Sequence, residues 1–424
     1  MSSGTLRPSA RAAALAVQRD ALVDDLRWLV RTPSVTGDES TLQVRLADRL
    51  EALGLAVEIF HPDPAAIRED PAWPGEEVPR SALPVVLARA GRPGGRRLIL
   101  SGHVDVVPAG ERSSWTVDPW AGDVRNGRLY GRGACDMKGG VAAILGALRA
   151  LGAAGLLDSL AGELLVVLVP SEEDGGQGTL AAIRAGATGD LCVIPEPSGL
   201  DVVVAHAGAI TFRVTVPGRA AHASTRREGV SALDNLHHLV VALEADEARR
   251  NAEETDPLMT QLGLPYPTIV GTVSGGAWAS TVMDQVVAEG RYGVRLGQSP
   301  EAAEEELRRC ISEACDGHEF LRAHPATLEI TGARFATARV PAAHPLPVGL
   351  VEVATRITGL RPSLVGVPYG ADMRLFVNEG GTPCVIFGPG DVRLAHGADE
   401  SVPLDEVEAC ARVLAAWVVT EIGG

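Results

Sequence analysis

The chain has 424 residues, more than one ordinary compact core holds, so we expect two structural units. Hydrophobic residues form 46% and charged residues 22% of the chain, which is typical of a soluble globular protein and argues against disorder. The formal net charge of −16 argues against nucleic-acid and anionic-membrane partners, because both require clustered Lys and Arg to neutralise phosphate.

The sequence gives no signal for secretion or membrane insertion. The N-terminal segment contains no uninterrupted apolar stretch, and no apolar run long enough to span a bilayer follows it. The six cysteines form no C-x-x-C pair, and a chain of this length does not need disulfides. We therefore expect a cytoplasmic protein in a reducing compartment.

The first half of the chain alternates short apolar runs with helical stretches. Apolar residues at helical spacing predict helices over 12–30 and 41–53, followed by a strand over 54–60. The Pro-rich stretch 61–80 has no sustained apolar period and predicts a surface loop. Further strands and helices are expected at 83–89, 96–103, 141–155, 163–170, 179–186 and 190–195. This alternation indicates an α/β fold with a largely parallel sheet, on which ligands gather at the carboxyl ends of strands.

The pattern changes after His206. Period-two strands and long amphipathic helices follow one another up to residue 332, which predicts a small α+β unit with an antiparallel sheet. The first pattern resumes with a strand near residue 384 and a final helix over 404–419. We therefore expect a catalytic domain in two parts, 1–207 and 333–424, interrupted by an inserted domain, 208–332.

Residues that can bind metal follow the predicted strands. His103 and Asp105 lie two apart in an extended segment and share a face, so the carboxylate can fix the tautomer of a ligating histidine. Asp136 stands between glycines just before a helix, where it fits either a helix N-cap or a metal ligand; we assign the neighbouring Cys135 to packing. Alone, each motif also fits an ordinary turn or surface hydrogen bond.

Consecutive carboxylates follow the strand that ends near Pro170. Glu172, Glu173 and Asp174 repel one another, so they form either an exposed acidic loop or a site neutralised by metal. Glu196 and His396 follow two further strands. Two histidines and several carboxylates at one sheet edge predict a dinuclear site.

The motifs SGHVDVVP, GRGACDMKGG, SEEDGG, IPEPS, PGRAAHAS and AHGADE occur in this order along nearly the whole chain. In this combination the sequence resembles the co-catalytic zinc amidohydrolases, the family that includes aminoacylase, acetylornithine deacetylase, succinyl-diaminopimelate desuccinylase and glutamate carboxypeptidase. The resemblance implies a zinc-exopeptidase-like catalytic domain, a lid domain that mediates a homodimer, and two divalent metal ions, zinc or cobalt.

The resemblance also implies individual roles. His103 and Glu196 would hold one metal, Glu173 and His396 the other, and Asp136 would bridge them, while Asp105 orients His103 and Glu172 is the general base. The lid residue His222 matches a histidine that stabilises the oxyanion, and Arg295 matches an arginine that holds a substrate carboxylate. Ser280 and Met283 depart from the family's usual Asn and Pro in the lid.

The leading prediction is hydrolysis of an N-acyl amino acid or related N-acyl amine, of the acetylornithine deacetylase type. The residues of the segment GGAWASTV also resemble those of an N-formyl aminopyrimidine deformylase. A succinyl-diaminopimelate desuccinylase and a dipeptidase or carboxypeptidase are further alternatives. A non-catalytic metal-binding protein is the alternative outside enzymes.

Overall fold

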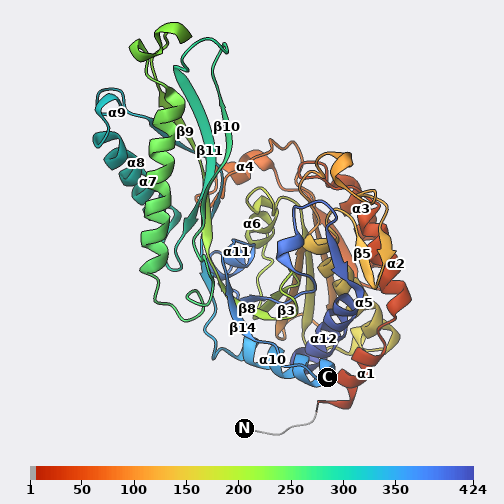
Figure 1. Ribbon diagram of the computed structural model, residues 1–424. Helices are drawn as coiled ribbons and strands as arrows, with labels where there is room; N and C mark the ends of the chain where they lie inside the picture. Colours follow the sequence, from red (N-terminus) through yellow and green to blue (C-terminus); the bar gives the residue numbers. More distant parts are fainter. Residues whose placement is uncertain (1–5) are drawn as a thin grey trace.

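A computed structural model describes residues 6–424. Its two main sheets belong to separate layers, each with its own helices (Figure 1), and a third sheet has three short strands. The larger sheet has nine strands, with β14 paired to β8 beside the main order β1-β2-β6-β3-β7-β15-β8-β13. Its strands are β1 (Ala56–Phe60), β2 (Val85–Gly91), β3 (Arg97–His103), β6 (Glu163–Val169), β7 (Leu191–Ile194), β8 (Val202–His206), β13 (Ala338–Arg339), β14 (Leu364–Val367) and β15 (Cys384–Ile386). The four central strands β6, β3, β7 and β15 are parallel, whereas β1, β2, β8 and β13 pair with their neighbours in the main order in the antiparallel sense.

Helices cover both faces of this sheet, as the alternating sequence pattern predicts (Figure 1). They are α1 (Pro8–Leu15), α2 (Arg19–Val30), α3 (Ser40–Ala52), α4 (Pro64–Arg68), α5 (Gly139–Ala153), α6 (Gln177–Arg184), α10 (Pro345–Thr358), α11 (Met373–Asn378) and α12 (Leu404–Ile422). Helix α5 packs against α2, α12 and β3, and it is buried on almost every side because small residues let its neighbours approach. A three-stranded sheet, β4 (Asp123–Arg125), β5 (Arg128–Tyr130) and β16 (Ser401–Pro403), closes one end.

The start of α5 fits tightly under the strand end that carries Glu196. A Cβ added at Gly140 would lie 2.0 Å from the Pro195 carbonyl oxygen. Gly140→Ala should therefore force the Pro195–Glu196 backbone to move and lower the free energy of unfolding by about 1–3 kcal/mol, measured by urea denaturation. Gly152→Ala on the same helix is the control, since its Cβ meets no atom closer than 3.4 Å. Equal stability of the two variants would contradict this packing.

The smaller sheet has the order β10-β11-β9-β12 and is antiparallel throughout. Its strands are β9 (Gly208–Pro217), β10 (Thr268–Gly275), β11 (Gln285–Val294) and β12 (Thr327–Phe335), with helices α7 (Ala232–Ala252), α8 (Pro300–Asp316) and α9 (Glu319–Ala323). Along β9, Phe212 and Val214 are buried in the core with α7 and α8, whereas Thr211 and Arg213 lie on the other face. Figure 1 shows this second face turned towards the larger sheet.

We propose the division 1–207, 208–332 and 333–424 for the two units, because each sheet, apart from the end of β12, draws its strands from one side of these limits. Strand β12 runs three residues past the proposed limit of 332, to Phe335. Residues 1–5, with which the first part begins, lie outside the described residues.

The Pro-rich stretch 61–80 differs in part from the predicted surface loop. It contains the short helix α4, and its later part is anchored by Arg80, a buried arginine whose guanidinium donates to Glu39 at 2.8 Å and to Asp174 at 3.0 Å. The apolar pattern could not reveal this anchor, because two acidic partners distant in sequence supply it. The prediction of a surface loop is therefore confirmed for most of the stretch, and it missed α4 and the buried Arg80.

Candidate metal centre and active site

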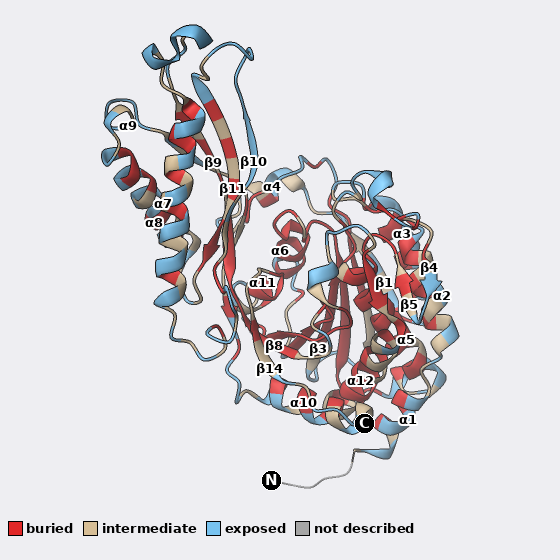
Figure 2. Cartoon of the chain, viewed as in Figure 1, coloured by how far each residue is buried: buried red, intermediate tan, exposed pale blue. Residues whose placement is uncertain are grey.

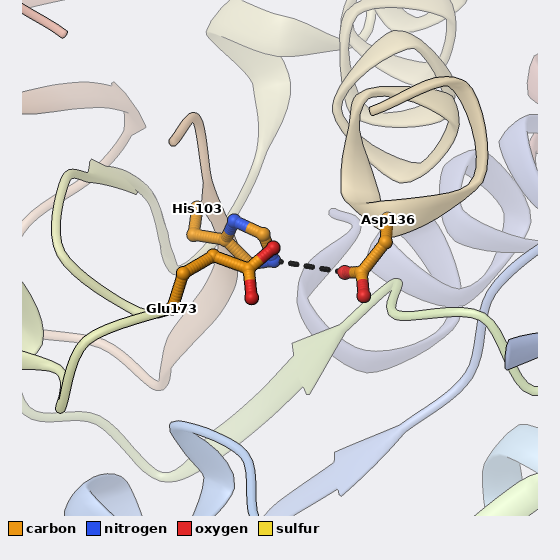
Figure 3. Close-up of side chains that lie close together, drawn as sticks. All are labelled: His103, Asp136 and Glu173. Atoms are coloured by element: carbon orange, nitrogen blue, oxygen red, sulfur yellow. Dashed lines mark hydrogen bonds and ion pairs between the residues drawn. The ribbon is translucent and has the colours of Figure 1, made fainter. Parts of the chain in front are cut away.

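The predicted ligands meet at the carboxyl end of the parallel strands. His103 is the last residue of β3, Glu173 follows β6 and Glu196 follows β7. His396 lies in the loop between β15 and β16, and Asp136 lies in the turn that opens α5. Figure 3 shows His103, Asp136 and Glu173 directed towards one another from three separate segments.

Asp136 lies between two sets of ligands. Its Oδ1 is 3.1 Å from His103 Nε2, which is also 3.4 Å from Glu196 Oε1. Its Oδ2 is 3.5 Å from His396 Nε2, which is 3.0 Å from Glu173 Oε2. Each carboxylate oxygen of Asp136 thus faces a different histidine, and each histidine lies beside a different glutamate.

Burial and mutual repulsion make the carboxylates of this cluster unstable as anions without a cation. Burial, together with the charge of Asp136, raises the pKa of Glu173 to about 7 and that of Glu196 to about 8. Hydrogen bonds to Asp136 and Glu173 raise the pKa of His396 to about 11. Within residues 6–424, no Lys or Arg nitrogen lies within 4.0 Å of the three carboxylates. Imidazole and carboxylate donors without a neutralising side chain fit zinc-like cations.

Asp105 contacts both His103 and the loop that carries Glu172 and Glu173. Its carboxylate accepts hydrogen bonds from the N–H groups of Glu172, at 3.2 Å, and Glu173, at 3.1 Å. The Nδ1 of His103 is 2.9 Å from the backbone carbonyl of Asp105 and 3.6 Å from its carboxylate. Asp105 therefore fixes the backbone of the acidic loop as well as the histidine ring.

Glu172 lines the same cavity as Glu173, but among residues 6–424 it forms no ion pair with a histidine, whereas Glu173 lies 3.0 Å from His396. The side chain of Glu172 is buried, and burial raises its pKa well above the ordinary value. Within residues 6–424, no basic nitrogen lies within 4.0 Å of its carboxylate. A carboxylate with an elevated pKa beside a cation site is suited to accept and return a proton.

Sequence reasoning missed the structural role of Glu400. This buried carboxylate pairs with Arg132 at 2.5 Å and accepts the N–H groups of Gly133, Cys135 and Asp136 at 2.9–3.0 Å. It therefore holds the turn that presents Asp136. The acidic residue four positions after His396 was a signal in the sequence, but its partners lie more than 260 residues away.

Arg374 and Asp372 support the acidic loop from the second part of the catalytic domain. Arg374 stacks on Phe335 at 4.1 Å and donates a hydrogen bond of 2.6 Å to the Gly175 carbonyl. Asp372 accepts a hydrogen bond of 2.5 Å from the Thr179 hydroxyl. Both residues are buried, and their contacts are to protein groups behind the cavity.

A cavity of about 380 Å³ opens beside the ligands, between the two sheets. Its lining includes Glu172 and Tyr369 from the catalytic side and Ala209, Thr211, Arg291 and Phe335 from the lid sheet. The lid therefore forms one wall of the cavity.

The two lid residues predicted to bind substrate lie away from this cavity. Arg295 pairs with Glu253 at 3.3 Å and Glu306 at 3.4 Å, and a role in holding a substrate carboxylate stays a prediction. Arg291 lies four residues earlier, in strand β11, and it lines the cavity wall. His222 is exposed, with Nδ1 2.8 Å from the Ser224 hydroxyl, and it does not line the cavity of its own chain.

The helices of residues 6–424 include none with the length and apolar character that crossing a membrane would demand.

A mixed α/β sheet with imidazole and carboxylate groups gathered at its strand ends is an arrangement typical of metal-dependent hydrolases. The chain belongs to peptidase family M20/M25/M40, whose sequence model matches residues 99–420. This confirms the family indicated by the motifs.

Curated relatives have several activities in their names. The chain is 31% identical over 401 residues to a succinyl-diaminopimelate desuccinylase of Paracoccus denitrificans (strain Pd 1222), covering 91% of this chain and 94% of that protein. It is 25% identical to the N-formyl-4-amino-5-aminomethyl-2-methylpyrimidine deformylase of Bacillus subtilis (strain 168), covering 76% and 79%. An acetylornithine deacetylase of Photorhabdus laumondii is 26% identical, covering 93% and 96%.

Solved structures show the same fold. Human carnosine dipeptidase 1 matches with a TM-score of 0.75 at 17% identity, covering 98% of both chains.

Proposed function

We propose that the protein hydrolyses the amide bond of an N-acyl amino acid or related N-acyl amine, using two divalent metal ions. The observation that carries this proposal is the position of Asp136 between two His–Glu pairs, with Glu172 beside them in one cavity. Relatives with desuccinylase, deacetylase and deformylase names support the class of reaction and leave the acyl group open.

The ligand set divides between the two metals. His103 and Glu196 would hold one ion, Glu173 and His396 the other, and Asp136 both; zinc or cobalt suits these donors. When bound, such a pair of ions supplies Lewis acidity for the scissile carbonyl and lowers the pKa of water.

The chain's own groups would move the proton. Glu172 takes the proton of the attacking water and returns it to the nitrogen of the leaving amine. Asp105 holds the backbone N–H groups of Glu172 and Glu173, so the base and a ligand keep a fixed separation. The buried position of Glu172 keeps bulk water from competing for that proton.

The lid would complete the site through a homodimer. Strand β10 is an edge strand whose residues are largely exposed, including Ile269 and Val273, and exposed edges readily pair with another chain (Figure 2). His222 does not line the cavity of its own chain. In a homodimer, His222 of one chain would reach the cavity of the other chain and donate a hydrogen bond to the oxyanion there.

Arg291 replaces Arg295 as the candidate ligand for a substrate carboxylate. Its guanidinium donates one hydrogen bond, of 3.4 Å, to the Pro368 carbonyl, and among residues 6–424 no carboxylate oxygen lies within 4.0 Å of it. Arg291→Met should lower kcat/KM for a carboxylate-bearing substrate about 10- to 100-fold, because a charge-assisted pair is lost. Arg295→Met should leave kcat/KM near the wild-type value. A larger loss of kcat/KM for Arg295→Met than for Arg291→Met would instead support Arg295 as the ligand of the substrate carboxylate.

Amine release from a panel of amides tests the proposed function. The panel contains N-acetylornithine, N-succinyl-diaminopimelate, N-formyl aminopyrimidine and dipeptides, assayed with zinc or cobalt and with a chelator. Chelator-sensitive release from one acylated amine supports amide hydrolysis and identifies its substrate class. Metal-loaded protein that releases no amine from any of them favours the alternative of a non-catalytic metal-binding protein.

A further inference from the structure

Glu77 brings a carboxylate to the cavity from outside the metal-binding motifs. It belongs to the stretch between α4 and β2 and lines the same cavity as Asp136 and Glu173. Its neighbour Glu76 is neutralised, because Arg68 Nε and Nη2 each donate to it at 2.9 Å. By contrast, no Lys, Arg or His nitrogen of residues 6–424 lies within 4.0 Å of the Glu77 carboxylate.

The backbone on both sides of Glu77 is fixed. Before it, the Pro74 carbonyl accepts a hydrogen bond of 2.6 Å from the N–H of Arg334 in the lid strand β12. After it, the N–H of Val78 donates to the Asp174 carboxylate at 3.3 Å, in the loop that carries the acidic ligands. Contacts to the lid and to the acidic loop therefore set the position of Glu77 relative to both walls of the cavity.

Glu77 and Arg291 lie on either side of Thr211. Thr211 is the register partner of Arg291 in the β9–β11 pair, and its hydroxyl donates to Glu77 Oε1 at 3.5 Å. The next charges on these strands, Arg213 and Glu289, neutralise each other at 2.6 Å. Arg291 and Glu77 form no such pair: among residues 6–424 their hydrogen bonds are to uncharged groups, and neither has an oppositely charged side chain within 4.0 Å. This part of the wall therefore offers one cation and one anion without a charged protein partner.

We propose that Glu77 binds a free ammonium group of the substrate, next to a carboxylate held by Arg291. The substrates would then be acylated diamino acids or related acylated diamines that keep one charged amine beyond the scissile amide. Ammonium–carboxylate hydrogen bonds are charge-assisted, so they distinguish such compounds from uncharged analogues of equal length. This inference rests on the proposed function, whose site it subdivides.

Matched ligands test the role of Glu77. The first pair is Nα-acetyl-ornithine and Nα-acetyl-norvaline, and the second is N-succinyl-diaminopimelate and N-succinyl-2-aminopimelate; the members of a pair differ only in the charged amine. Binding is measured by calorimetry on the zinc-loaded full chain. Every protein tested carries Glu172→Gln, which stops turnover. We expect the ammonium-bearing member of at least one pair to bind about tenfold tighter. Glu77→Gln should remove this preference, and Glu76→Gln should keep it.

Three outcomes would overturn the role of Glu77. They are equal binding within both pairs, a preference that survives Glu77→Gln, and a preference that Glu76→Gln also removes, because the last assigns the effect to the loop rather than to the carboxylate. Failure of the proposed function is a separate result: an ammonium preference without hydrolysis of any amide keeps the role of Glu77 and rejects the reaction. Hydrolysis of an amide without the ammonium preference keeps the proposed reaction and rejects the role of Glu77.

Discussion

Replacing Glu172 by glutamine should lower kcat about 100- to 10,000-fold, the contribution typical of a general base. The side chain is buried in the cavity without a basic partner, so glutamine keeps its volume but cannot accept the proton. The metal ligands stay in place, because Asp105 holds this loop through backbone N–H groups that the substitution does not change. Initial rates on the best amide of the panel measure the loss.

Zinc content is the control for this variant. Wild-type and Glu172→Gln protein should carry the same amount of zinc after identical dialysis. If turnover survives within a factor of ten, Glu172 is not the base. If zinc is lost together with activity, the residue acts through the metal centre instead.

Glu400→Ala should lower the free energy of unfolding by about 3–5 kcal/mol, because it leaves Arg132 as an uncompensated buried charge. It also removes the acceptor for the N–H groups of Gly133, Cys135 and Asp136, so the turn that presents Asp136 loses its support. Urea denaturation of the metal-free protein measures the stability, and zinc titration should show weaker binding.

Asp405→Ala is the matched control for Glu400→Ala. Asp405 pairs with Arg19 at 2.6 Å, but its side chain is 86% exposed, and exposed ion pairs contribute about 0–1 kcal/mol. A loss for Glu400→Ala as small as that of the control would show that the Asp136 turn does not depend on Glu400.

The sequence pattern was sufficient to predict the architecture, because the spacing of apolar residues depends only on neighbouring positions in the chain. The alternation of strands and helices predicted the parallel centre of the main sheet, and period-two residues such as Phe212 and Val214 predicted a lid sheet with one buried face. The pattern was insufficient where a helix breaks: the stretch predicted as one helix over 12–30 is two, α1 and α2, separated by residues 16–18. The apolar positions continue across that break, so periodicity alone does not reveal it.

Candidate ligands were accessible to sequence reasoning because each lies at a strand end, in the loop that follows a strand, or in the turn that opens a helix. Residues that act through tertiary contacts were not. Glu400 contacts the Asp136 turn. Arg291 lies within β11 and lines the cavity, whereas Arg295 lies just past the end of that strand and pairs with Glu253 and Glu306. Glu77 was hidden in a stretch without periodicity, whose position depends on hydrogen bonds to both the lid and the acidic loop.

The zinc stoichiometry of the purified chain tests the dinuclear centre most directly. Mass spectrometry of metal-loaded, dialysed protein should give two zinc ions per chain, and His396→Ala should give one, because His103, Asp136 and Glu196 still surround the other position. One ion or none in the wild-type protein would contradict the division of the ligands between two metals.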